Sequence, residues 1–158
     1  MNHIGNRADA LLAFHHHSKG TELPEGWVNL GSGSYRHSYA SPERVVYKVQ
    51  YYSDEGYNDA GIAIPDCNKR EADFYAQHKD DPKPAGFNLA PCRLWGRRVL
   101  AMPLISGPNG QSMGGWHADE GVRLAAHRWC RDHFIYDVGG DNWLIDENYR
   151  LWLVDYAQ

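Results

Sequence analysis

Residues 27–52 constrain the fold most, because they alternate between strand-forming runs and turn residues. A Gly-rich turn follows Leu30, a Ser-Pro turn follows Ala40, and the run RVVYKVQYY is rich in β-branched and aromatic side chains. Residues 91–105 repeat the pattern, with a turn at Gly96. Strands joined by such short turns pair antiparallel. We therefore expect a five-stranded antiparallel sheet.

Three segments have the apolar spacing of amphipathic helices, and they cover residues 8–17, 68–78 and 117–133. The last is followed by a predicted hairpin with arms at 143–145 and 151–154. Strands gathered first and a helix with a hairpin afterwards predict an α+β fold of two unequal lobes.

The predicted organisation is one domain over residues 1–158. Its N-lobe, with one central helix, covers 1–106, a Gly-rich hinge covers 107–115, and a reduced C-lobe of one long helix and the hairpin covers 116–158.

Composition narrows the class of protein. No apolar run approaches the ~20 residues of a membrane helix, and the N-terminus lacks the pattern of a secretory signal. The three cysteines are far apart, which favours a reducing, cytoplasmic setting. A net charge of -4 argues against binding to nucleic acid through the overall field. We expect no membrane and no nucleic-acid partner.

The first candidate site combines a Gly-x-Gly turn with a lysine. Gly31 and Gly33 alone are typical of a tight hairpin. Lys48, however, lies inside an apolar strand, where its ammonium group must reach water or an anion. Glu71 on the next predicted helix offers such an anion, although an exposed edge lysine and an exposed helix glutamate are the simpler interpretations.

The second candidate site lies at the C-terminal hairpin. Asn142 precedes the first arm and Asp155 follows the second, so the two side chains are expected at the same end of the hairpin. Carboxylate and amide oxygens are ligands of Mg²⁺. Asp137, in the Gly-rich loop before them, could orient or deprotonate a hydroxyl group. A plain turn explains that loop equally well but does not explain Asp155.

In their order and spacing these motifs resemble the protein-kinase-like superfamily, which includes protein kinases and phosphotransferases of the aminoglycoside and choline kinase type. The likeness runs from Trp27 to the end of the chain. It implies that Lys48, paired with Glu71, holds the phosphates of ATP, and that Asp137 serves the acceptor hydroxyl. Asn142 and Asp155 would be the ligands of Mg²⁺.

The same resemblance implies a nucleotide-binding surface. The loop over the phosphates would be formed by Gly31, Ser32, Gly33 and Ser34, and the adenine ring would be surrounded by Val46, Met102, Leu104 and Leu144. The expected function is transfer of the γ-phosphate of ATP to a hydroxyl group of a protein or a small molecule. The alternative is a pseudokinase-like binding module that regulates a partner without phosphoryl transfer.

The chain also departs from the family pattern. Arg36 stands at the third glycine position of the loop, Ile135 and Tyr136 replace the His-Arg before Asp137, and only three residues follow Asp155. The helix side chains Leu124, Trp129 and Cys130 then lack an expected neighbour, so we expect a homodimer or a protein partner over the reduced C-lobe.

Histidine offers a further, weaker candidate. His127, Cys130 and His133 recur every third residue on one predicted helix and could bind a transition metal, but no fourth ligand is evident. The run at 15–17 is more typical of a polar surface, since its side chains point in different directions around a helix.

Overall fold

The computed structural model of this chain describes residues 4–33, 35–51, 56–57, 63–64, 66–96, 98–136 and 138–156. The fold is α+β, with a five-stranded antiparallel sheet and, among the described residues, three α-helices. The chain divides into two compact units. Unit 1 comprises Met1–Asp73 and Pro91–Leu104, and unit 2 comprises Phe74–Ala90 and Ile105–Gln158.

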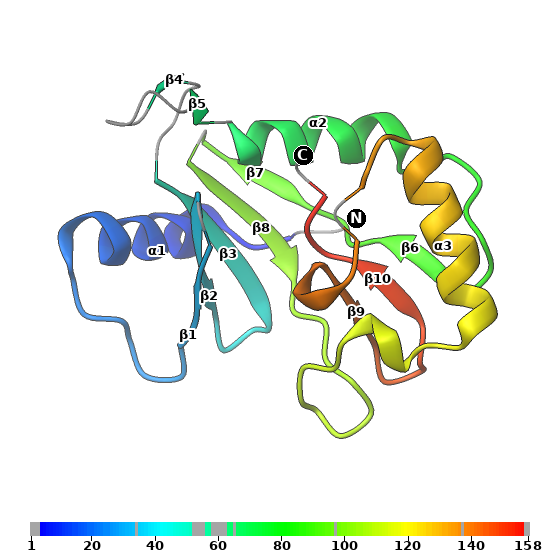
Figure 1. Cartoon of the computed structure of the whole chain (residues 1–158). Coiled ribbons are helices and arrows are strands. Elements are labelled where there is room, and N and C mark those ends of the chain that lie inside the picture. Colours follow the sequence, from blue (N-terminus) through cyan, green and yellow to red (C-terminus); the bar gives the residue numbers. More distant parts are fainter. Residues whose placement is uncertain are drawn as a thin grey trace. The chain divides into compact units, whose positions relative to one another are not determined.

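The sheet of unit 1 confirms the five predicted antiparallel strands (Figure 1). They are β1 (Val28–Ser32), β2 (Arg36–Ala40), β3 (Val45–Gln50), β7 (Arg93–Trp95) and β8 (Val99–Pro103). Their order in the sheet is β1-β2-β3-β8-β7. The short turns at Ser41–Pro42 and Gly96 explain why sequential strands are neighbours. Strand β8 lies between β3 and β7, so residues distant in sequence meet at the centre of the sheet.

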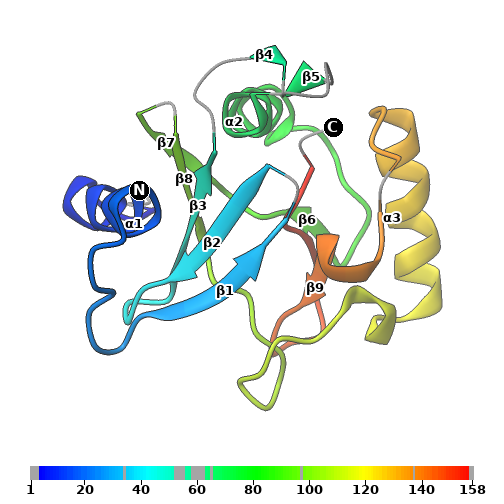
Figure 2. The ribbon, with the colours of Figure 1, turned by 60° about the vertical axis from the view of Figure 1, so that its left-hand side comes forward.

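Helix α1 (Arg7–Lys19) covers one face of this sheet, lying against β3 and β8 (Figure 2). The helix begins where the Asn6 side chain accepts a hydrogen bond from the Asp9 amide at 2.8 Å, and it ends at Gly20, whose φ of 68° suits glycine. Its buried alanines contact a core formed by Tyr39, Tyr47, Val49, Val99 and Ala101.

The opposite face of the sheet is partly polar. Strand alternation places Tyr47 and Val49 toward α1, and therefore Lys48 and Gln50 on the other face. Helix α2 (Cys67–His78) contributes the buried side chains of Asn68 and Glu71. Burying these polar groups requires hydrogen-bonding partners for each of them. A two-stranded ladder of β4 (Gly56–Tyr57) and β5 (Ala63–Ile64) precedes the helix.

Unit 2 contains a three-stranded sheet in the order β6-β10-β9. The hairpin of β9 (Trp143–Ile145) and β10 (Leu151–Leu153) confirms the prediction, whereas β6 (Phe87–Leu89), which pairs parallel to β10, was not predicted. Unit 2 also contains two short 3₁₀ helices, η1 (Gly115–His117) and η2 (Gly140–Asn142), of which η2 directly precedes β9.

Helix α3 (Glu120–Asp132) is shorter than the predicted segment because Asp119 caps it, accepting hydrogen bonds from the amides of Gly121 and Val122. Its apolar face is largely covered inside unit 2. Cys130 is fully buried, and Trp129 packs edge-on against Phe74, while Leu124 is 59% exposed. The predicted unpartnered face is therefore reduced to Leu124.

Of the predicted N-lobe of 1–106, residues 74–90 and 105–106 belong to unit 2, and the rest forms unit 1. Within the described ranges, no helix combines the length and the apolar character that crossing a membrane requires.

Candidate functional site

Lys48 and Glu71 form a buried ion pair, with 2.8 Å between Lys48 Nζ and Glu71 Oε1. Lys48 lies in the middle of β3, and Glu71 lies one turn into α2. Glu71 is fully buried and Lys48 is only 7% exposed. The simpler interpretations of an exposed edge lysine and an exposed helix glutamate are therefore both wrong.

A second cation contacts the same carboxylate. Arg36 Nη2 lies 3.0 Å from Glu71 Oε2, so each oxygen of Glu71 faces a different cation. Together the three side chains carry two positive charges and one negative charge. From the sequence, Arg36 was noted only because it replaces the third glycine of the predicted phosphate loop. The period of two places Arg36 on one face with Ser38, but only the register, in which Ser38 pairs with Lys48, puts Arg36 on the face of Lys48.

Asn68 and Gln50 fix this cluster in place. The Asn68 backbone amide donates to Gln50 Oε1 at 2.8 Å, and Asn68 Nδ2 donates to the Lys48 carbonyl at 3.1 Å. Arg36 Nη1 donates to Asn68 Oδ1 at 3.3 Å. Because the first turn of α2 is thereby bonded to β2 and β3, the position of Glu71 is determined by the backbone.

The ionisation state of Glu71 follows from this setting. Burial raises the pKa of its carboxyl group, but the charges and hydrogen bonds of Arg36 and Lys48 outweigh that effect and leave the pKa below its ordinary value. Glu71 is therefore a carboxylate at neutral pH.

The predicted phosphate loop lies at the β1–β2 hairpin. Gly31 has a φ of 110°, which favours glycine, and a Cβ added at Gly31 or Gly33 would meet no atom within 4 Å. The loop is held by hydrogen bonds from the Gly33 amide to the Arg36 carbonyl at 2.8 Å and from Tyr51 Oη to the Gly33 carbonyl at 3.0 Å. Ser32 ends β1, and Ser34 lies outside the described residues.

Of the four apolar residues predicted to surround adenine, Val46 and Met102 are neighbours in the sheet of unit 1. Val46 and Met102 are directly paired between β3 and β8, on the same face as Lys48. Met102 is buried, at 1% exposure, and Val46 is half-buried. Leu104 follows β8, and its amide donates to the Arg44 carbonyl at 2.9 Å. Leu144 lies in unit 2, half-buried on β9.

The two predicted metal ligands come together in unit 2. The backbone amides of Val154 and Asp155 donate to the Asn142 carbonyl at 2.8 and 3.3 Å. Asn142 and Asp155 thus lie side by side at one end of the β9–β10 hairpin, and both side chains are partly exposed. An amide and a carboxylate are hard oxygen donors that suit Mg²⁺. Asp137 lies outside the described residues.

Unit 2 also contains a cluster of two histidines and one aspartate that was not predicted from the sequence. His78, Asp81 and His133 lie close together, although the sequence grouped His133 with His127 and Cys130. Cys130 is fully buried and the His127 ring contacts Trp143, so these two side chains do not join His133 in one accessible site.

Fold and site define an α+β protein that carries a Lys-Glu-Arg cluster in one unit and, in the other, Asn142 and Asp155 on adjacent stretches of backbone. No protein-family model, no curated protein and no solved structure matches the chain.

Proposed function

We propose that this chain is a kinase-like phosphotransferase that moves the γ-phosphate of ATP to a hydroxyl group. The observation that carries the proposal is the buried Lys48–Glu71 pair at 2.8 Å, formed between a central strand and the following helix as the resemblance implied. An apolar strand rarely buries a lysine without a chemical reason. The five-stranded antiparallel sheet beneath it is consistent with the N-lobe of the kinase-like fold.

In this proposal Lys48 binds the α- and β-phosphates and Glu71 holds its ammonium group in position. Arg36 adds a second cation beside the same carboxylate, which favours an anionic ligand. The loop of Gly31, Ser32, Gly33 and Ser34 covers the phosphates. Adenine contacts the apolar side chains of Val46, Met102, Leu104 and Leu144.

Asn142 and Asp155 hold the magnesium ion, whose role is to neutralise charge on the phosphates during transfer. The acceptor oxygen forms a bond to the γ-phosphorus, the bond between that phosphorus and the β,γ-bridging oxygen breaks, and ADP leaves with the electron pair. Asp137 accepts the proton of the acceptor hydroxyl; this role rests on the resemblance alone.

Lys48→Met and Asp155→Ala test the proposal. Purified protein with ATP and Mg²⁺ is assayed for ADP formation and self-phosphorylation, and nucleotide binding is followed by thermal melting. We expect turnover in the wild type and a loss of about 100- to 1,000-fold in each variant, because each removes a charge that stabilises the transferring phosphate. Glu43→Gln, at an exposed position, is the matched control and keeps full activity.

Two other results separate the alternatives. Mg²⁺-dependent stabilisation by ATP without any turnover would assign the pseudokinase-like binding module instead. No effect of ATP on the melting temperature or on turnover would falsify both nucleotide-dependent functions.

A protein partner remains part of the proposal. Leu124 is exposed on α3, where we expected a homodimer or another protein to bind. Sedimentation of the wild type and of Leu124→Glu checks this: a wild-type dimer that the charge dissociates supports self-association, and two identical monomers contradict it.

A further inference from the structure

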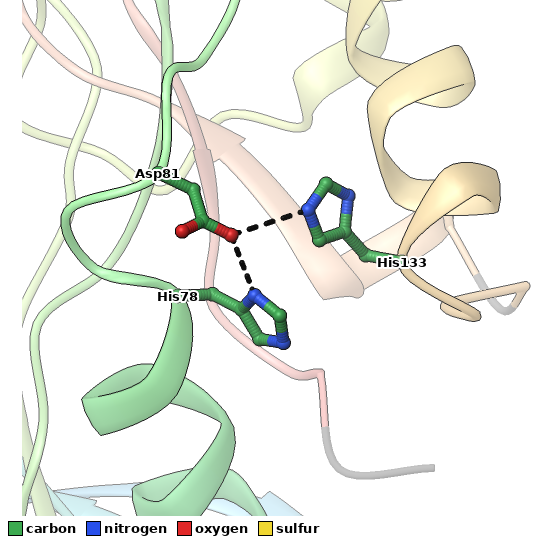
Figure 3. Close-up of side chains that lie close together, drawn as sticks. All are labelled: His78, Asp81 and His133. Carbon is green, nitrogen blue, oxygen red and sulfur yellow. Dashed lines mark hydrogen bonds and ion pairs between the residues drawn. The ribbon is translucent and has the colours of Figure 1, made fainter.

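The side chains of His78, Asp81 and His133 converge at one point of unit 2 (Figure 3). Asp81 Oδ2 lies 2.7 Å from His78 Nδ1 and 3.4 Å from His133 Nε2. One ligand atom from each residue lies within 4.8 Å of the other two. His78 ends α2, Asp81 lies in the turn after it, and His133 follows the last residue of α3.

The free ring nitrogen of His133 faces the Asp81 carboxylate. His133 Nδ1 lies 2.7 Å from the Trp129 carbonyl oxygen, which can only accept, so Nδ1 carries a proton. Nε2 is then the ring nitrogen that faces the carboxylate of Asp81, and it can bind a metal ion through its lone pair when it carries no proton. Nε2 and the Asp81 carboxylate oxygen are 3.4 Å apart, so one metal ion can bind both of them.

Aromatic packing fixes both imidazole rings. The His133 ring stacks on Trp129 with 3.7 Å between ring centroids, and the His78 ring contacts Phe74 at 4.4 Å. Trp129 is itself held by a hydrogen bond from its indole nitrogen to the Pro82 carbonyl at 3.0 Å. The ligands are therefore positioned before any ion arrives, which reduces the entropy lost on binding.

Helix ends and exposure favour an incoming cation. His78 and His133 stand at the C-terminal ends of α2 and α3, where the helix dipole contributes partial negative charge. The side chains of His78, Asp81 and His133 are 19%, 39% and 21% exposed, so an ion can enter from solvent. The nearby ammonium group of Lys83 donates to the carbonyl oxygens of His78, Lys79 and Asp81, which leaves the ring nitrogens and the carboxylate to a metal.

We propose that His78, Asp81 and His133 bind a divalent transition-metal ion of the zinc type, with water completing four-coordination. Two imidazole nitrogens and one carboxylate oxygen suit Zn²⁺ and its neighbours in the first transition series, whereas Mg²⁺ prefers oxygen ligands alone. The site is independent of the proposed phosphotransferase function. Its role is to tie the end of α2 to the end of α3.

The test is a Zn²⁺ titration of the full chain near neutral pH by calorimetry, compared among variants. His133→Asn and Asp81→Asn each remove one ligand. His127→Gln is the matched control, since it removes an exposed histidine from the same helix. We expect the wild type and the control to bind one Zn²⁺ with equal affinity. The two ligand variants should bind at least ~100-fold more weakly.

Thermal melting gives a second readout. Zn²⁺ should raise the melting temperature of the wild type and of His127→Gln, because an ion that binds only the folded state stabilises it, and should leave His133→Asn and Asp81→Asn unchanged. Melting without metal verifies that all variants are folded.

Co²⁺ gives a test that needs only the wild type. In a four-coordinate site Co²⁺ absorbs visible light intensely, so we expect intense absorption when it binds to the wild-type protein. Weak absorption typical of six-coordinate Co²⁺, no saturable binding of Zn²⁺, or undiminished Zn²⁺ binding by both ligand variants would each overturn the proposal. The last result would place the ion elsewhere, for example at the histidine run of 15–17.

Discussion

At the residue scale, the buried carboxylate of Glu71 lies between the cations of Arg36 and Lys48, so neutralising it should be costly. Glu71→Gln keeps the shape of the side chain but leaves Arg36 and Lys48 facing an amide. We expect a loss of about 3–5 kcal/mol in the free energy of unfolding, the cost of breaking a buried pair from one side. Urea denaturation measures it. Glu43→Gln, at an exposed position, should change stability by about 0.5 kcal/mol or less.

Lys48→Met should separate stability from activity. Removing the ammonium group of Lys48 leaves the Arg36–Glu71 ion pair, 3.0 Å apart, in which one positive charge balances one negative charge. The loss in the free energy of unfolding should therefore be clearly smaller than for Glu71→Gln. Activity should nevertheless fall as strongly as proposed above. Denaturation curves of the two variants side by side decide the order. A Lys48→Met protein as unstable as Glu71→Gln contradicts the shared-carboxylate arrangement.

Gly115 is a residue-scale constraint on unit 2. A Cβ at this position would lie 2.6 Å from Leu151 Cδ1 and from Trp143 Cγ, both in buried side chains. Gly115→Ala should therefore cost about 1–3 kcal/mol through overpacking, measured by urea denaturation. Gly114→Ala is the matched control. Its Cβ would meet the side chain of Trp116, which is 64% exposed and can rotate away, so equal losses in the two variants would contradict this explanation.

At the scale of elements, the contact between α1 and β2 should make unit 1 sensitive to acid. Burial, with the nearby charges of His37 and Arg98, lowers the pKa of His17 below 6.5, and burial also lowers the pKa of His37. The unfolded chain then binds more protons near and below that pH, so stability falls as the pH falls through 6.5.

His17→Gln measures this contribution. Urea midpoints of the wild type should decline from about pH 7.5 to about pH 5.5, and the decline should be shallower in the variant, which loses one of the two groups. The His17 ring also stacks on Tyr51 at 5.3 Å, so the variant will start from a lower midpoint. An identical slope in both proteins would show that His17 does not cause the pH dependence.

The elements that sequence could predict are those with local signals. The five strands of unit 1, α2 and the β9–β10 hairpin follow from periodicity and turn residues. Strand β6 was missed because three residues carry no detectable period, and its parallel pairing with β10 is a long-range contact.

The same distinction separates the site residues. Lys48 and Glu71 could be proposed because a buried lysine needs a partner and the next helix offers one. Arg36 was missed because its partner depends on the register of β2 against β3. His78, Asp81 and His133 were missed as a group because the ends of two helices bring them together, and no spacing in the sequence encodes that meeting.

At the scale of the whole molecule, the two units are interleaved along the chain. Residues 74–90 belong to unit 2 but precede β7 and β8, which complete the sheet of unit 1. A linear division into lobes could not anticipate this, because pairing of β6 with β10 determines it. Strand β8 is central to unit 1, since its Leu100, Ala101 and Met102 are almost fully buried between β3 and β7.

This interleaving predicts how shortened chains behave. A chain ending at Leu104 keeps every strand of the five-stranded sheet and its core with α1, so amide hydrogen exchange should remain slow in β3. In the same sample, amides of β6 should exchange quickly, because β10 is gone. A chain ending at Ala90 lacks β7 and β8 and should show no slowly exchanging amides in β3 or in β6. Equal protection of β3 in the two chains would contradict the central role of β8, and fast exchange in both would show that unit 1 requires residues of unit 2 to fold.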